Sequence, residues 1–186
     1  MLKLDSPIEH TDVSGAFRST VGLLATLCKH QQALELVSNE NELLDSIIEV
    51  IPHNNQDGLD DYIASCCLIL RYILRLEQTY VKVASRHPHM GDILGTRLAR
   101  KGNSPEVMTE CASAFRNFVR KPEFTSKIDP VTVDFVVQAM RNSMPSNDEV
   151  DAGVRNTLGQ ALNFLSRVPL LGQRIDLLQA RDLMRE

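Results

Sequence analysis

The feature that most constrains this chain is a helical pattern that recurs about every 45 residues. Four segments share one register, with successive offsets of 46, 45 and 47 residues: 23–27, 69–73, 114–118 and 161–165. Apolar residues around each segment follow the i, i+3, i+4 spacing of a helix face. A helical unit of this length cannot bury its apolar face alone, so successive units must stack. The recurrence therefore predicts an all-α protein built from packed helical units.

Two shorter helices are expected after each of the first three copies, in the ranges 31–37 and 41–51, 78–86 and 90–99, and 124–128 and 131–143. The fourth copy is followed by 170–186. Prolines stand where these helices would begin or end. The order Ser104, Pro105, Glu106 is that of an N-cap and the first two helical positions, so a helix should begin there. No stretch alternates as a strand does, and no sheet is predicted.

The ends of the third and fourth copies resemble the armadillo pattern Ala-Leu-x-Asn-Leu. They read AFRNF at 114–118 and ALNFL at 161–165, and Asp148-Glu149-Val150 resembles the usual acidic entry to that helix. The chain thus resembles the armadillo repeat family, or the closely similar HEAT family. The resemblance implies a right-handed α-solenoid of about four repeats over residues 12–186, after an N-terminal extension over 1–11. The third helices of the repeats are then expected near 13–29, 59–76, 105–120 and 148–167.

The chain departs from the peptide-binding members of that family at their groove positions. Those members carry a ladder of asparagines, with tryptophans one turn earlier. The ladder positions here are Thr26, Tyr72, Asn117 and Phe164. Only Asn117 matches, and the chain contains no tryptophan. We therefore do not expect an extended basic peptide to be held by an asparagine ladder.

Composition excludes several classes of protein. The net charge is −4 and aromatic residues make up 5%, which disfavours binding to a nucleic-acid backbone. No apolar run approaches the roughly 18 residues that a membrane span needs. The start of the chain is too polar and acidic for a signal peptide. We expect a protein of the cytoplasm or nucleus that does not enter a membrane.

Catalytic and metal-binding patterns are absent from the sequence. No GxSxG, P-loop, HExxH or GxGxxG motif occurs in a fitting context, so we expect no enzyme and no cofactor. His87 and His89 lack the helical spacing of a metal pair and have no completing ligands nearby. The four cysteines lie in apolar helical patterns without a CxxC, and are expected to be free buried thiols: Cys28, Cys66, Cys67 and Cys111.

A cation stands three residues beyond every ladder position: Lys29, Arg75, Arg120 and Arg167. One interpretation is that each favours the negative end of its helix macrodipole. The other is a ridge of positive charge, widened by Arg71 and Arg116, that receives carboxylates of a partner. Tyr72, Asn117 and Phe164 are expected on the same third-helix surface, either as groove contacts or as core.

We expect the protein to be a protein–protein interaction scaffold or adaptor. Its partner helix or acidic tail is expected to lie along the third-helix surface. The candidate contacts are Arg71, Tyr72, Arg75, Arg116, Asn117, Arg120 and Arg167. Two alternatives stay open. One is a regulatory domain of a larger protein, autoinhibitory or GTPase-binding, and the other is a structural module that self-associates through the ends of the stack.

Overall fold

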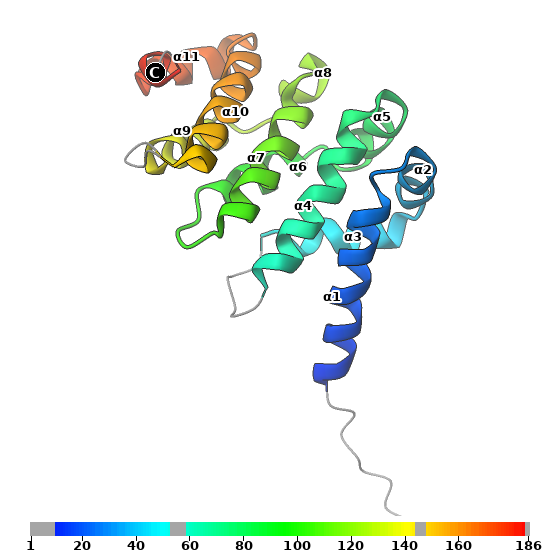
Figure 1. Ribbon diagram of the computed structural model, residues 1–186. Coiled ribbons are helices and arrows are strands. Elements are labelled where there is room, and N and C mark those ends of the chain that lie inside the picture. Colours follow the sequence, from blue (N-terminus) through cyan, green and yellow to red (C-terminus); the bar gives the residue numbers. More distant parts are fainter. Residues whose placement is uncertain (1–9, 53–58, 144–147, 185–186) are drawn as a thin grey trace, which may run out of the picture.

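The computed structural model describes residues 10–52, 59–143 and 148–184 (Figure 1). Every regular element in these ranges is a helix, and they contain no strand. The prediction of an all-α protein is confirmed. The expected N-terminal extension, 1–11, falls almost wholly on residues outside the described ranges.

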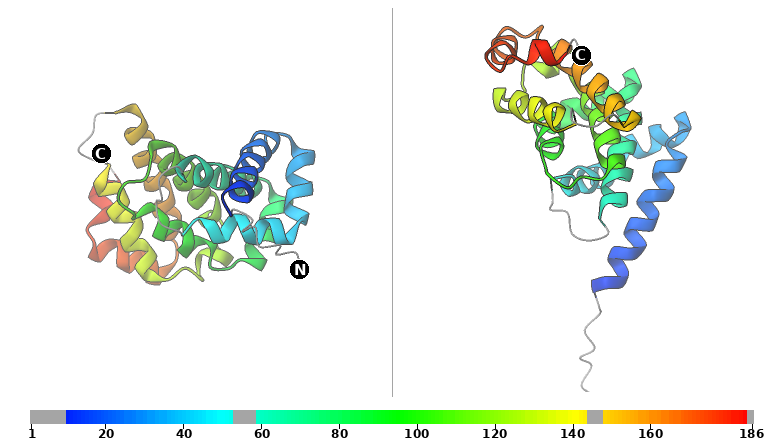
Figure 2. Two further views of the ribbon diagram at one scale, coloured as in Figure 1. Left: turned by 90° about the horizontal axis from the view of Figure 1, so that it is seen from below. Right: turned by 60° about the vertical axis from the view of Figure 1, so that its left-hand side comes forward.

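Four long helices form a row in which each packs against the next in chain order (Figure 1). They are α1 (His10–Leu27), α4 (Asp60–Arg75), α7 (Pro105–Val119) and α10 (Glu149–Leu165). Their positions agree with the four helices expected near 13–29, 59–76, 105–120 and 148–167. Two further views show that α1 stands at one end of the row and the C-terminus lies at the other (Figure 2).

The shorter helices connect the members of the row. They are α2 (Gln31–Asn39), α3 (Asn41–Val50), α5 (Glu77–Arg86), α6 (Met90–Leu98), α8 (Pro122–Thr125), α9 (Pro130–Asn142), α11 (Pro169–Leu177) and α12 (Ala180–Leu183). Helix α6 packs against both α7 and α9, so it forms part of a second layer behind the row. The segment that follows the fourth copy contains α11 and α12, which are divided at Gln179, whose backbone is left-handed with φ of 53°.

Polar residues begin three of the helices as their chemistry requires. The Ser104 hydroxyl accepts a hydrogen bond from the backbone N–H of Val107 at 3.3 Å, which confirms the predicted start of α7. Asp129 caps α9 and Asp148 caps α10 in the same manner. A capping side chain satisfies a backbone donor that the first helical turn leaves unpaired.

One hydrogen bond recurs at the ends of two row helices, and a glycine takes the corresponding position after a third. Thr79 Oγ1 donates to the carbonyl of Ile73 at 2.5 Å, and 46 residues later Thr125 Oγ1 donates to the carbonyl of Val119 at 2.8 Å. The corresponding position after α10 is Gly172, where a Cβ would lie 2.8 Å from the carbonyl oxygen of Ser166. Each connection thus brings one residue close to a carbonyl oxygen at the carboxyl end of the preceding row helix. That residue is a threonine, whose hydroxyl donates to the oxygen, or a glycine, which has no Cβ to collide with it.

The cysteines are free and buried, as expected. Burial raises the pKa of the Cys28 thiol to about 11. A hydrogen bond to Cys111 and burial raise the pKa of Cys67 well above its ordinary value. Thiols held protonated in this way act as small apolar groups between helices rather than as nucleophiles.

The packing of α6 on α9 yields a test of the fold. A Cβ at Gly95 would lie 2.4 Å from Thr132 Cγ2, and Thr132 is held by a 2.6 Å hydrogen bond to Asp92. We expect Gly95→Ala to lower the free energy of unfolding by about 1–2 kcal/mol, because overpacking outweighs the gain in helix propensity. Chemical denaturation measures the change.

Gly153 of α10 is the matched control, since a Cβ added at this residue would have no atom within 4 Å. Gly153→Ala should raise the free energy of unfolding by up to about 1 kcal/mol. Equal effects of the two substitutions would contradict the close approach of α6 and α9.

Candidate interaction surface

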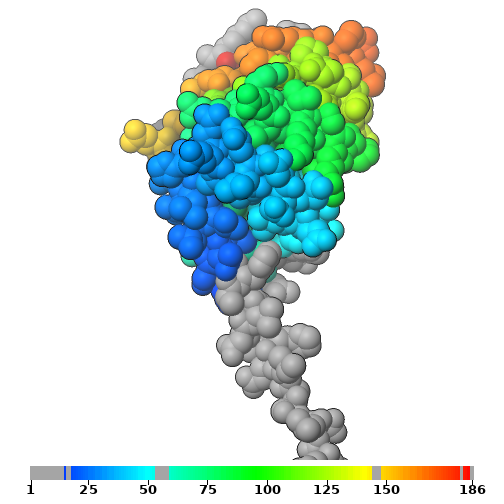
Figure 3. Space-filling view, turned by 90° about the vertical axis from the view of Figure 1, so that its right-hand side faces the viewer, coloured from blue at the N-terminus to red at the C-terminus, as the bar shows by residue number. Residues whose placement is uncertain are grey.

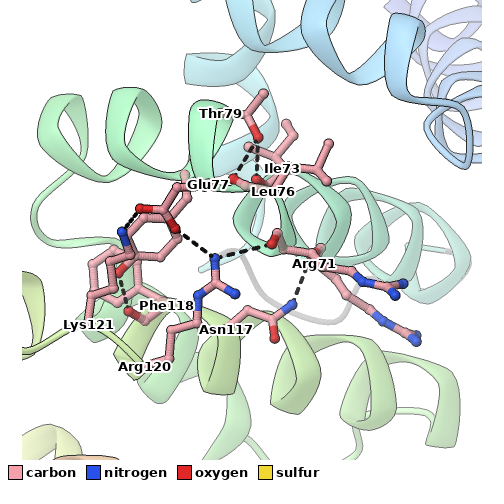
Figure 4. Close-up of polar contacts among 11 residues, drawn as sticks. Arg71, Ile73, Leu76, Glu77, Thr79, Asn117, Phe118, Arg120 and Lys121 are labelled. Atoms are coloured by element: carbon pink, nitrogen blue, oxygen red, sulfur yellow. Dashed lines mark hydrogen bonds and ion pairs between the residues drawn. The ribbon is translucent and has the colours of Figure 1, made fainter.

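Four of the predicted arginines meet where α4 packs against α7, and we call them the arginine cluster: Arg71, Arg75, Arg116 and Arg120. Each helix contributes two, at positions i and i+4, which place both side chains on one helix face. Figure 4 shows this contact and the polar groups that cross it.

Arg71 is fixed by a carboxylate of the neighbouring helix. Its Nη1 donates to both Glu110 oxygens, at 3.1 and 2.9 Å. The guanidinium also lies 5.8 Å from the centre of the Tyr72 ring. Because its side chain keeps 37% of its surface exposed, Arg71 both joins α4 to α7 and remains accessible from solvent.

Arg116 lies in the most positive part of the cluster. Its guanidinium donates to two neutral oxygens, Gln160 Oε1 of α10 at 3.3 Å and Asn117 Oδ1 at 3.1 Å. Partial burial lowers the pKa of this guanidinium, and its three arginine neighbours lower it further. The arginines are therefore close enough to repel one another, and a further anion near them would be stabilised.

Arg120 stabilises a helix end that is not its own. Its Nη2 donates to the carbonyl of Arg75, at the carboxyl end of α4, at 3.2 Å (Figure 4). It also lies 3.8 Å from a carboxylate oxygen of Glu77 and 5.1 Å from the Tyr80 ring centre. Arg120 thus places its charge at the carboxyl end of α4, where the helix macrodipole is negative, and not at the end of α7, the helix that it follows.

Arg75 and Arg167 are the two exposed members of the predicted set. The guanidinium of Arg167 stacks on Phe164, 4.8 Å from the ring centre, just beyond the end of α10. In the described part of the chain, the Arg75 side chain makes no hydrogen bond or ion pair. Its donors are open to a partner.

Asn117 does not lie on the exposed surface, and that prediction is wrong. It is 7% exposed, and its Nδ2 donates to the carbonyl of Arg71 at 3.0 Å (Figure 4). The position faces α4, because the row packs more closely there than an open groove allows. Tyr72 and Phe164 are partly buried against the core.

The counter-charges of the cluster could not be found in the sequence. Glu110 pairs with Arg71 across 39 residues, and Glu77 pairs with Lys121 across 44. No periodicity links these positions, since they depend on how one helix is turned against the next. With Lys121, five cations lie near Glu110 and Glu77, and Glu123 also lies close to Tyr80, so the surface keeps an excess of positive charge.

Other kinds of site find little support in the described residues. No helix there combines the length and apolarity that a bilayer crossing requires. No three potential metal ligands gather in the same residues. His87 Nε2 lies 3.4 Å from Asp45 and His89 Nδ1 lies 3.7 Å from Asp92, so the two histidines face different carboxylates.

Comparison with known proteins adds no relative. No family model, curated protein or solved structure matches the chain.

Because Asn117 is buried and Arg75 is exposed, substitutions at the two residues should change the free energy of unfolding by different amounts. We expect Asn117→Ala to lower the free energy of unfolding by about 1–2 kcal/mol, because it removes a buried hydrogen bond between α7 and α4. Arg75→Ala should change it by less than about 0.5 kcal/mol, as an exposed side chain without partners does. Urea denaturation followed by circular dichroism measures both changes. A small effect of Asn117→Ala would contradict the buried position of that residue.

Proposed function

We propose that the chain is a right-handed, armadillo- or HEAT-like α-solenoid that acts as a protein–protein interaction scaffold or adaptor. Its partner is an acidic helix or tail that lies across the arginine cluster. The observation that carries this proposal is the excess positive charge at the α4–α7 contact, in a protein whose net charge is −4.

The order of the helices supports the solenoid. Row helices follow one another at the spacing of the sequence recurrence, and each packs against its predecessor. The hydrogen bond made by Thr79 returns at Thr125, and Gly172 occupies the corresponding position after α10. Repeated units that contact only their neighbours build extended surfaces, which this class of protein uses to bind other proteins.

An acidic partner is supported by how the arginines are held. Glu110 orients Arg71, and the carbonyl of Arg75 orients Arg120, so their guanidinium groups are ordered before a partner arrives. Arg75 keeps its own donors open. Carboxylates spaced i, i+4 on a partner helix match the i, i+4 spacing of the arginines and can pair with their planar forks.

The buried thiols support a reducing compartment for this activity. All four cysteines are free, and the structure holds them between helices. Disulfides are rare in the cytoplasm and nucleus, where we place the protein.

Charge reversal at Arg75 tests the proposal with a defined probe. The probes are two fluorescein-labelled alanine-based helical peptides, one with Glu and one with Lys at i, i+4. Fluorescence anisotropy should show binding of the Glu peptide only, weakening as salt is raised. Arg75→Glu should weaken that binding at least about fivefold, which corresponds to about 1 kcal/mol.

Lys101→Glu is the matched control. Lys101 is exposed in the turn before α7, and the substitution makes the same change in charge away from the arginine cluster. It should leave the affinity for the Glu peptide unchanged. Equal losses in the two variants would mean that only net charge attracts the peptide, and the proposed surface would be wrong.

A natural partner is then sought with the same proteins. In a pull-down from cell extract read by mass spectrometry, the partner should be retained by the wild type and Lys101→Glu and lost from Arg75→Glu. Its binding segment should be rich in Asp or Glu.

A further inference from the structure

Helix α1 exposes leucines on the side that points away from the rest of the row. It buries Val21 and Ala25, and residues two positions further along a helix lie on the opposite face. Leu23 and Leu27 occupy that face and are 61% and 44% exposed. Leu36 of the adjoining α2 is 69% exposed. Figure 3 looks onto this end of the molecule, which α1, α2 and α3 form, and we call the three leucines the leucine face.

The sequence recurrence shows what normally covers these positions. The residues that align with Leu23 and Leu27 in the other row helices are all 0% exposed: Ile69, Ala114 and Ala161, and Ile73, Phe118 and Leu165. Each of those helices has a preceding helix packed against it. The leucine face therefore continues an interface that the chain makes three times internally, and a helix is the element that fits it.

The same helix carries glycines that the fold does not require. Nothing lies within 4 Å of a Cβ built at Gly15 or Gly22. Glycine inside a helix costs about 1 kcal/mol relative to alanine. Gly22 lies beside Leu23 and, with exposed Thr26 one turn later, leaves room for a second helix to approach closely.

The outer face of α10, the last helix of the row, does not offer an apolar counterpart, although Leu170 and Leu177 of the following α11 are exposed. Helix α10 exposes Asn156, Gln160 and Asn163, which line a hollow of about 280 Å³. A row of helices with an apolar outer face at one end and a polar outer face at the other buries the apolar face best against the same face of a second copy. Such isologous two-fold contacts are also the commonest form of self-association.

We infer that the leucine face is an isologous dimer interface in which α1 of a second copy packs antiparallel against it. Two-fold symmetry brings Leu23 of one copy against Leu27 of the other, twice, around an axis near residues 25–26. The four leucines are removed from water together, while the arginine cluster is not used. This inference does not depend on the proposed acidic partner.

Sedimentation equilibrium of the full chain tests it. The wild type should show a mass twice its 20.8 kDa at micromolar concentration and dissociate on dilution. Leu23→Asp/Leu27→Asp should weaken the dimer at least a hundredfold with an unchanged helical circular dichroism spectrum. A wild type that stays monomeric at hundreds of micromolar would overturn the inference.

Leu177→Asp separates this dimer from a head-to-tail contact. Leu177 of α11 is 75% exposed at the other end of the chain, so it matches the leucines of α1 in exposure but not in position. The variant should remain dimeric. If Leu177→Asp dissociates the complex instead, the contact joins opposite ends and the isologous arrangement is wrong.

A cross-link tests the symmetry directly. In Thr26→Cys the new thiols of two copies should lie beside each other near the two-fold axis. Oxidised glutathione should then join them in one disulfide between identical residues, each pair of thiols yielding two electrons and two protons to the oxidant. The native cysteines are buried, so the wild type is the control. A dimer that forms no such link would also overturn the two-fold arrangement.

Discussion

The structure depends on helices that bury their apolar stripes only because the next helix in the row covers them. Ile73 of α4 and Phe118 of α7 occupy matching positions in neighbouring row helices, and both are 0% exposed. Burial of one such side chain contributes about 1.5–3 kcal/mol, which no helix of the row obtains alone. Polar links cross the contact between α4 and α7, including the side-chain amide of Asn117, which donates to the carbonyl of Arg71 at 3.0 Å. These links fix how far one helix is turned against the next.

That fixed rotation decides what the arginines do. The same turn of α7 that buries Asn117 against α4 aims Arg120 at the last carbonyls of the preceding helix. Arg71 is held by Glu110 and yet stays partly exposed. If the cluster binds a partner as proposed, structural and binding roles are shared within it: the held arginines order the surface, and Arg75 offers open donors. A substitution at Arg120 would disturb both roles, which makes Arg75 the more informative position.

A stack of helices has two ends, and the ends of this one differ. Helix α10 presents the amide side chains of Asn156, Gln160 and Asn163 to solvent. Helix α1 presents Leu23 and Leu27, which belong by register to positions that are buried everywhere else in the row. The stacking that creates the arginine cluster in the middle of the row therefore leaves an apolar face at one end. The contacts inside the row and the exposed face of α1 both follow from the packing of each row helix against the next.

The sequence by itself determined the helices, their recurrence near every 45 residues, the start of α7 at Ser104 and the free state of the cysteines. These features are local or periodic, and capping chemistry and apolar spacing report them directly. It also placed Arg71 and Arg116 in corresponding positions. Only the tertiary structure decided that Asn117 is buried, that Glu110 pairs with Arg71, and that Leu23 is left uncovered. Those outcomes depend on the rotation of one helix against another and on which helix faces other described helices cover, and neither is encoded in the pattern of a single segment.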